Sequence, residues 1–121
     1  MILLDTSVWI DHIRRREEQA EVLLKRRQVL VHPFVTGELA LGPMPRYDLF
    51  IQSLSELPQA TVALDSEVLF FIKRHSLMGS GIGYVDAHLL TSVQLQPGGR
   101  LWTRNKRLAK VAMALGVGYE A

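Results

Sequence analysis

Short apolar runs alternate with segments of helical spacing along this chain, and this alternation restricts its fold more than any other feature. Residues 2–4, 29–31 and 101–103 are such runs, the last ending in a threonine. The segments between them are long enough to hold helices. Strands joined through helices run parallel, because a parallel crossover needs about a dozen residues or more. The pattern predicts an α/β domain with a mainly parallel central sheet, which binds ligands at the carboxyl ends of its strands.

Helix-capping residues stand next to these runs. Residues 5–7 can cap a helix after the first run, and Pro33 suits the first turn of a helix through residue 41. Asn105 suits the cap of a last helix through residue 115. The other expected elements are helices over residues 47–57, 65–75 and 84–93, a strand or extended segment over residues 61–64, and a last short strand over residues 117–119.

The length and composition fit one soluble domain. The chain has 121 residues, of which 48% are hydrophobic, so we expect a single domain over residues 1–121. No apolar run approaches the ~20 residues of a membrane helix, and Asp5 interrupts the first run before a signal peptide could form. We therefore expect a soluble, cytoplasmic protein. There is no cysteine, and the four histidines show no metal-binding spacing, so oxygen ligands would hold any metal.

Three acids stand where such a sheet would bring them together. Asp5 follows the first expected strand, Glu38 lies in the helix after the second, and Asp86 lies in the helix after a glycine-rich loop. Each alone is well explained as a helix cap, an exposed helix position or an ion-pair partner. In one cleft the three would repel each other and favour a divalent cation. Oxygen ligands favour Mg²⁺ or Mn²⁺, which suits hydrolysis of a phosphodiester.

These acids fall within four motifs that follow one another along nearly the whole chain. The motifs are Leu3-Leu4-Asp5-Thr6-Ser7-Val8-Trp9-Ile10-Asp11, Thr36-Gly37-Glu38-Leu39, Gly83-Tyr84-Val85-Asp86-Ala87-His88-Leu89-Leu90 and Leu101-Trp102-Thr103-Arg104-Asn105-Lys106-Arg107-Leu108. Their order and spacing resemble the PIN-domain nucleases, particularly the VapC-type toxins. The resemblance implies a three-layer α/β/α sandwich and an endoribonuclease that depends on Mg²⁺ or Mn²⁺ held by Asp5, Glu38 and Asp86. It also implies a homodimer and inhibition by a cognate antitoxin protein.

One position departs from the family's pattern, because the fourth motif usually carries an aspartate where this chain has Asn105. As a catalytic residue, Asn105 would keep a hydrogen bond but bring no charge, which would weaken metal binding. Capping the last helix is an equal alternative. Ser7 and Thr103 have hydroxyls near the strand ends that could orient a water, although local capping explains them as well. A catalytically weak or inactive RNA- or protein-binding module is therefore the alternative function.

The basic residues show a pattern in position rather than in number. The chain has fourteen Lys and Arg and twelve Asp and Glu, so its net charge alone does not indicate a nucleic-acid partner. Residues 14–16 and 25–27 are basic runs for which a solvated helix face is an equal explanation. A third cluster adjoins Asn105, and we expect it to hold the RNA backbone unless it too is a solvated face. Its members are Arg104, Lys106, Arg107 and Lys110.

Overall fold

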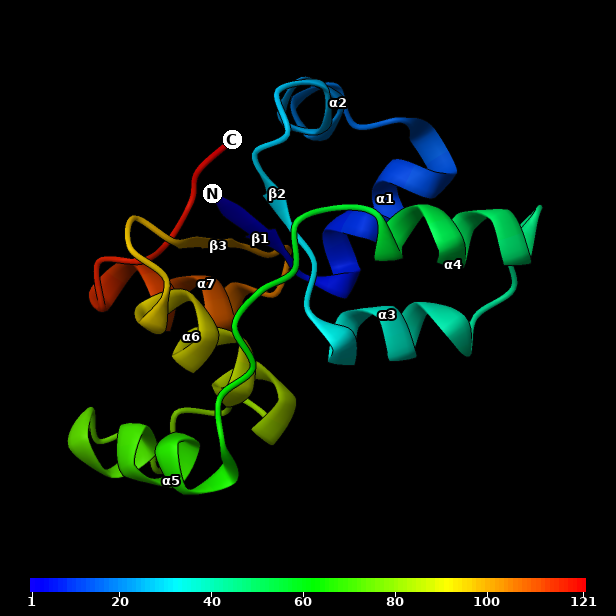
Figure 1. Cartoon of the computed structure of the whole chain (residues 1–121). Coiled ribbons are helices and arrows are strands. Elements are labelled where there is room, and N and C mark those ends of the chain that lie inside the picture. Colours follow the sequence, from blue (N-terminus) through cyan, green and yellow to red (C-terminus); the bar gives the residue numbers. More distant parts are fainter.

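The computed structural model describes residues 1–121 and centres on a three-stranded parallel sheet (Figure 1). Its strands are β1 (Ile2–Leu4), β2 (Val29–Leu30) and β3 (Arg100–Trp102), in the order β2-β1-β3. Leu3 stands opposite Leu30 on one side and Leu101 on the other, and all three are buried. The N-terminal strand is thus central and covered on both faces, as a parallel sheet requires.

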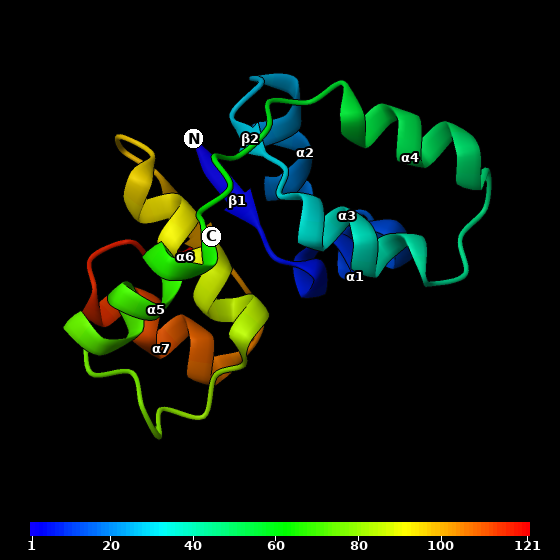
Figure 2. The ribbon, with the colours of Figure 1, turned by 60° about the horizontal axis from the view of Figure 1, so that its bottom comes forward.

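Seven helices cover the two faces of this sheet. Helices α1 to α4 lie on one side of the strands and α5 to α7 on the other (Figures 1 and 2). This is the expected three-layer α/β/α arrangement. The helices are α1 (Thr6–Arg15), α2 (Glu18–Lys25), α3 (Pro33–Ala40), α4 (Tyr47–Ser55), α5 (Asp65–Arg74), α6 (Tyr84–Leu95) and α7 (Lys106–Ala114).

The helix starts follow the capping signals of the sequence. Asp5 is the N-cap of α1, Pro33 opens α3, and Asn105 is the N-cap of α7. The sequence patterns did not predict α2, which follows the first basic run and ends at the first residue of the second, Lys25. Arg16 ends α1 with a φ of 54°, a turn that usually requires glycine. No glycine or proline stands at this break, so no local sequence signal predicted that one helix ends and a second begins there.

Neither of the two further expected segments, residues 61–64 and 117–119, forms a regular strand. Residues 61–64 lie outside the sheet, and the pairing beside β2 falls earlier, at a parallel bridge between Val31 and Gln59. Beside β3, the expected strand over residues 117–119 is a single bridge between Leu101 and Gly118. Gln59 and Gly118 therefore extend the sheet by one residue pair each, and the regular sheet stays three strands wide.

The core lies where the sheet meets the helices. Val8 of α1, Leu90 of α6 and Leu108 of α7 are fully buried against the strands. Burying such a side chain contributes about 1.5–3 kcal/mol. The core fixes the carboxyl end of β1, and with it Asp5. The longest helix, α6, has 12 residues, and no helix combines the length and apolar character needed to cross a membrane.

Candidate active site

Asp5, at the carboxyl end of β1, is the most firmly held of the predicted acids. It is only 9% exposed. Its Oδ1 accepts a hydrogen bond from Thr6 N (2.8 Å), and its Oδ2 accepts from Ser7 Oγ (3.1 Å) and Thr103 Oγ1 (2.7 Å). Its own N–H donates to Trp102 O (2.9 Å). These donors replace the water that a buried carboxylate loses, and they fix its orientation. Ser7 and Thr103 thus act on Asp5 itself.

Glu38 reaches the same region from α3, which packs against α1. Its side chain is exposed, and its Oε1 accepts a hydrogen bond from Thr6 Oγ1 (2.7 Å). Because Thr6 N also donates to Asp5, Thr6 connects the two acids. Sequence reasoning did not single out Thr6. Its place beside Asp5 in the capping run was the only signal, and a partner 32 residues away leaves no local pattern.

Asp86 lies in the first turn of α6, which packs against β3. Its Oδ2 accepts a hydrogen bond from Gly83 N (3.0 Å). Burial raises the pKa of Asp86, the hydrogen bond from Gly83 opposes this, and the negative charge of Asp5 raises the pKa further. The influence of Asp5 shows that these two carboxylates are electrostatic neighbours, although 81 positions apart in sequence.

Asn105 joins this region through its backbone. Its N–H donates to Thr103 Oγ1 (3.0 Å), whose hydroxyl donates to Asp5. Its side-chain Oδ1 accepts from Leu108 N (3.1 Å), which confirms the capping role. A catalytic role for the amide stays a prediction. The side chain faces α7, so its effect on the acids passes through Thr103.

The acids form an electrostatic group without forming a finished cation site. No three Asp, Glu or His side chains come together in the arrangement of a metal centre. Asp86 is turned towards the start of its own helix, and Glu38 towards Thr6. The donor chemistry nevertheless fits a hard divalent cation, because the negative charge of Asp5 disfavours the ionised form of Asp86 and a cation would relieve that repulsion.

The four predicted RNA-binding residues fall into two kinds. Lys106, Arg107 and Lys110 are exposed on α7. The guanidinium of Arg104 instead donates to Asp11 Oδ2 (3.0 Å) and Glu17 Oε2 (2.6 Å). A phosphate would have to compete with two carboxylates there. RNA binding by these residues stays a prediction, and it has its clearest support in the three side chains of α7.

Arg107 also contacts the glycine-rich loop before α6. A Cβ at Gly81 would lie 2.9 Å from Arg107 Cδ and 3.0 Å from its Nη1. Gly81 has a φ of +87°, which favours glycine for a second reason. The loop that leads to Asp86 therefore packs closely against the Arg107 side chain, which a side chain at position 81 would displace.

His32 has a structural role at the start of α3. It is fully buried, and its Nδ1 accepts a hydrogen bond from Phe34 N (3.0 Å), which caps α3. Burial lowers its pKa to about 4, and His88 contributes in the same direction. His32 is therefore neutral at physiological pH. Its part in the site is to start the helix that carries Glu38.

The comparisons with known proteins agree with this geometry. The family model described as PIN domain matches residues 2–113. The chain is 45% identical over 117 residues to Ribonuclease VapC32 of Mycobacterium tuberculosis, in strains CDC 1551 / Oshkosh and ATCC 25618 / H37Rv, covering 97% of this chain and 94% of each relative. A solved structure named "Toxin-antitoxin complex from Klebsiella pneumoniae" has a similar fold, with a TM-score of 0.68, 21% identity, and coverage of 90% of this chain and 91% of that one. This chain therefore belongs to the PIN-domain family.

Proposed function

We propose that this protein is a metal-dependent endoribonuclease that hydrolyses RNA phosphodiester bonds and acts in the cytoplasm as the toxin of a toxin-antitoxin pair. One observation carries the proposal: Asp5 and Glu38 both accept hydrogen bonds from Thr6, and the negative charge of Asp5 raises the pKa of Asp86, although the three acids come from distant stretches of the chain. The relative named as a ribonuclease supports the substrate class, because the similarity covers nearly all of both chains.

The cofactor of this proposal is Mg²⁺ or Mn²⁺, held by Asp5, Asp86 and Glu38. All three offer the carboxylate oxygens that these hard cations prefer. When bound, the cation would supply Lewis-acid stabilisation of the charge that builds up on the phosphate. Asn105 contributes no fourth carboxylate. The proposal therefore includes one tightly held ion.

The chain's own residues supply orientation and substrate binding. Ser7 and Thr103 donate to Asp5 and keep its carboxylate facing one way. Either hydroxyl can also accept from the attacking water, which is the role we propose for them. Lys106, Arg107 and Lys110 stand on the helix after Asn105. They would hold the RNA backbone by charge, which makes binding sensitive to salt without selecting a sequence.

An antitoxin partner would act by covering the acids. A hollow of ≈ 200 Å³ lies directly beside Glu38. Apolar side chains of α1 and α3 form much of its wall, including Ile10, Ile13 and Leu39. A partner that placed an apolar side chain there would block access to Glu38. This is the surface on which we propose that the inhibitory protein binds.

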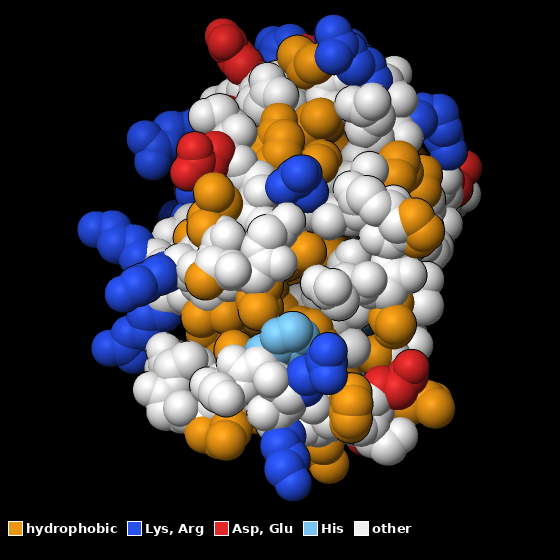
Figure 3. Space-filling view, turned by 90° about the vertical axis from the view of Figure 1, so that its left-hand side faces the viewer, with side chains coloured by type: hydrophobic (Ala, Val, Ile, Leu, Met, Phe, Trp, Pro, Cys, Tyr) orange, Lys and Arg blue, Asp and Glu red, His pale blue; other side chains and the backbone are white.

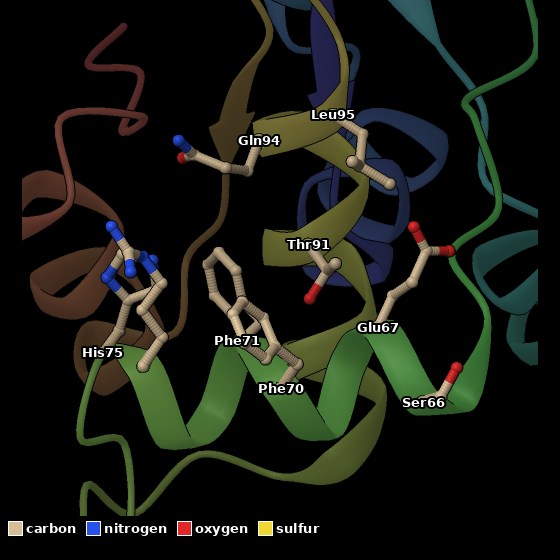
Figure 4. A pocket seen from close by; sticks show the side chains of 9 residues that line it. Ser66, Glu67, Phe70, Phe71, His75, Thr91, Gln94 and Leu95 are labelled. Carbon is tan, nitrogen blue, oxygen red and sulfur yellow. The ribbon is translucent and has the colours of Figure 1, made fainter.

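The exposed face of α5 is the surface through which we propose that two copies of the chain form a homodimer. A hollow of ≈ 500 Å³ lies between α5 and α6, away from the acids (Figure 4). Glu67, Phe70 and Arg74 line it at helical spacing, and Phe70 is 67% exposed. Figure 3 shows apolar side chains exposed on this side of the molecule. An antiparallel copy would place Glu67 against the other copy's Arg74 around a shared apolar centre, which is the self-complementarity of a two-fold interface.

Charge reversal tests this dimer. Arg74→Glu should shift the protein to monomer in analytical ultracentrifugation, because two acids would then face each other across the interface. Adding Glu67→Arg should restore the dimer. A dimer unaffected by Arg74→Glu would place the interface elsewhere.

RNA cleavage by the purified, partner-free chain tests the function. We expect total cellular RNA to give discrete fragments with Mg²⁺ or Mn²⁺ and none with EDTA. Asp5→Asn, Glu38→Gln and Asp86→Asn should each remove cleavage without unfolding the protein, because amides keep the shape but not the charge. Asp48→Asn is the matched control, since Asp48 is an exposed acid in the first turn of α4.

Two outcomes would contradict this proposal. Cleavage that persists in Asp86→Asn would mean that the acids do not form the site. A wild-type chain that binds Mg²⁺ and RNA but cuts none of a broad panel would favour the inactive binding module. In that case Asn105→Asp should be tested for restored cleavage.

A further inference from the structure

The guanidinium of Arg104 is held on three sides. Its Nε donates to Asp11 Oδ2 at 3.0 Å and its Nη2 to Glu17 Oε2 at 2.6 Å. Its Cζ lies 5.3 Å from the ring centroid of Trp102, in cation–π contact. Asp11 is on α1 and Glu17 is the N-cap of α2. One side chain therefore connects the turn after β3 to both helices that follow β1.

The backbone of the same residue is tied to α1 as well. Arg104 N donates to Ser7 Oγ (3.0 Å), and Ser7 Oγ donates to Asp5 Oδ2. Ser7 and Asp11 are four positions apart, so they lie on the same face of α1. The backbone of Arg104 thus binds Ser7, and its side chain binds Asp11 one turn further along the same face of α1. Thr103, the residue before it, donates to Asp5 Oδ2.

We propose that Arg104 is a positioning residue for Asp5: its ion pairs hold the turn over residues 103–105 against α1, so that Thr103 and Ser7 keep the Asp5 carboxylate in one orientation. This inference rests on the proposed function, because Asp5 is there a metal ligand. Each ion pair is partly exposed and weak alone. Arginine makes both ion pairs at once because two different nitrogens, Nε and Nη2, reach the two carboxylates. A lysine has a single nitrogen and cannot reproduce this geometry.

The competing role for Arg104 is contact with an RNA phosphate. The two roles predict opposite results when the carboxylates are removed. If Arg104 positions Asp5, the double variant Asp11→Asn/Glu17→Gln should damage the site as Arg104 variants do. If Arg104 binds RNA, the same double variant should free its charge and strengthen RNA binding.

The test compares Arg104→Lys with Arg16→Lys. Arg16 is a matched control, because it also joins an acid near the α1–α2 corner, Glu21, but has no hydrogen bond to the residues around Asp5. Mn²⁺ affinity is measured by calorimetric titration without RNA, and RNA affinity separately in EDTA. We expect Arg104→Lys and Asp11→Asn/Glu17→Gln to lower Mn²⁺ affinity by roughly 10- to 100-fold, as loss of groups that orient metal ligands does. Their RNA affinity should stay within about twofold of wild type, since no phosphate contact is lost. Arg16→Lys should change neither.

Unchanged Mn²⁺ affinity in Arg104→Lys would overturn the positioning role. So would stronger RNA binding in the double variant. A wild-type chain that binds no Mn²⁺ would instead count against the proposed function. The positioning role is then decided by amide hydrogen exchange, which needs no metal. The amides of residues 104 and 105 should exchange faster in Arg104→Lys than in Arg16→Lys, and equal exchange would refute the role.

Discussion

The two sides of the acidic group are built differently. Asp5 is buried at the end of the central strand and accepts hydrogen bonds from Thr6, Ser7 and Thr103. Glu38 is exposed and accepts from Thr6 Oγ1, while Asp86 accepts from Gly83 N and has a pKa raised by burial and by Asp5. The fold therefore fixes the Asp5 carboxylate in advance and leaves those of Glu38 and Asp86 able to turn towards a cation.

Changing the side-chain length of Asp5 and of Glu38 should have the largest and most unequal effects. Asp5→Glu keeps the charge but cannot keep the three hydrogen bonds, and a misplacement of about 1 Å can cost about a hundredfold in rate. We expect a loss of that order for Asp5→Glu and a clearly smaller one for Glu38→Asp, because Glu38 is exposed and can adjust. Single-turnover cleavage of a labelled RNA would measure both. Equal losses would show that Asp5 is no more fixed than Glu38.

Removing the link between the two sides should have the next largest effect. Thr6→Val keeps the backbone hydrogen bond to Asp5 but removes the hydroxyl that donates to Glu38. We expect a loss of about tenfold in Mn²⁺ affinity, as for other groups that orient metal ligands. Thr6→Ser keeps the hydroxyl and should remain near wild type. A tenfold loss in Thr6→Ser as well would assign the effect to packing.

The ionised carboxylate of Asp86 should slightly lower the free energy of unfolding. Its pKa is raised above the ordinary 3.8, so the folded chain holds this proton more tightly than the unfolded chain. The folded state therefore loses stability as pH rises from about the ordinary value through the raised pKa, and the penalty persists at neutral pH. Asp86→Asn should raise stability in EDTA at pH 7 by less than about 1 kcal/mol, since the group is partly exposed. With Mn²⁺ bound, the wild type should instead be more stable than Asp86→Asn.

Thermal and urea unfolding at pH 4 and pH 7 would measure this. At pH 4 the wild type and Asp86→Asn should be nearly equal in EDTA. A variant less stable than wild type at pH 7 in EDTA would mean that the carboxylate stabilises the fold.

The smallest expected effect concerns the loop beside Arg107. Gly81→Ala and Gly79→Ala both place a side chain at positive φ, at +87° and +74°, so each should lose about 1 kcal/mol of stability. Only Gly81→Ala would also displace Arg107, since a Cβ at Gly79 meets nothing within 4 Å. We expect RNA binding to weaken a few-fold in Gly81→Ala alone, with the salt slope falling by up to about 1. Equal RNA affinity in the two variants would argue against a phosphate contact by Arg107.

The local parts of this molecule could be predicted from its sequence. The cap formed by Asp5, the helix start at Pro33 and the cap formed by Asn105 all follow short-range chemistry, and the structure confirms them. The parallel sheet followed from apolar runs separated by helical spacing. The family followed from the order of four motifs. Each of these signals lies within a few residues or in a regular pattern.

The long-range contacts could not be predicted in the same way. Thr6 donates to Glu38 across 32 positions, and Arg104 donates to Glu17 across 87. Which donor meets which acid depends on how α1, α3 and the turn after β3 pack, and packing leaves no periodic trace. For this reason the sequence assigned Arg104 to RNA by its charge and its place beside Asn105, and the ion pairs indicate another role.

Crystals grown with Mn²⁺ would show where the cation binds, because an anomalous difference map locates the ion itself. We expect one strong peak at about 2.1 Å from a carboxylate oxygen of Asp5 and of Asp86. Asp5 should keep its hydrogen bonds to Ser7 and Thr103, while Asp86 turns away from Gly83. A strong peak elsewhere, with none at Asp5, would contradict the assignment of this acidic group as the metal site.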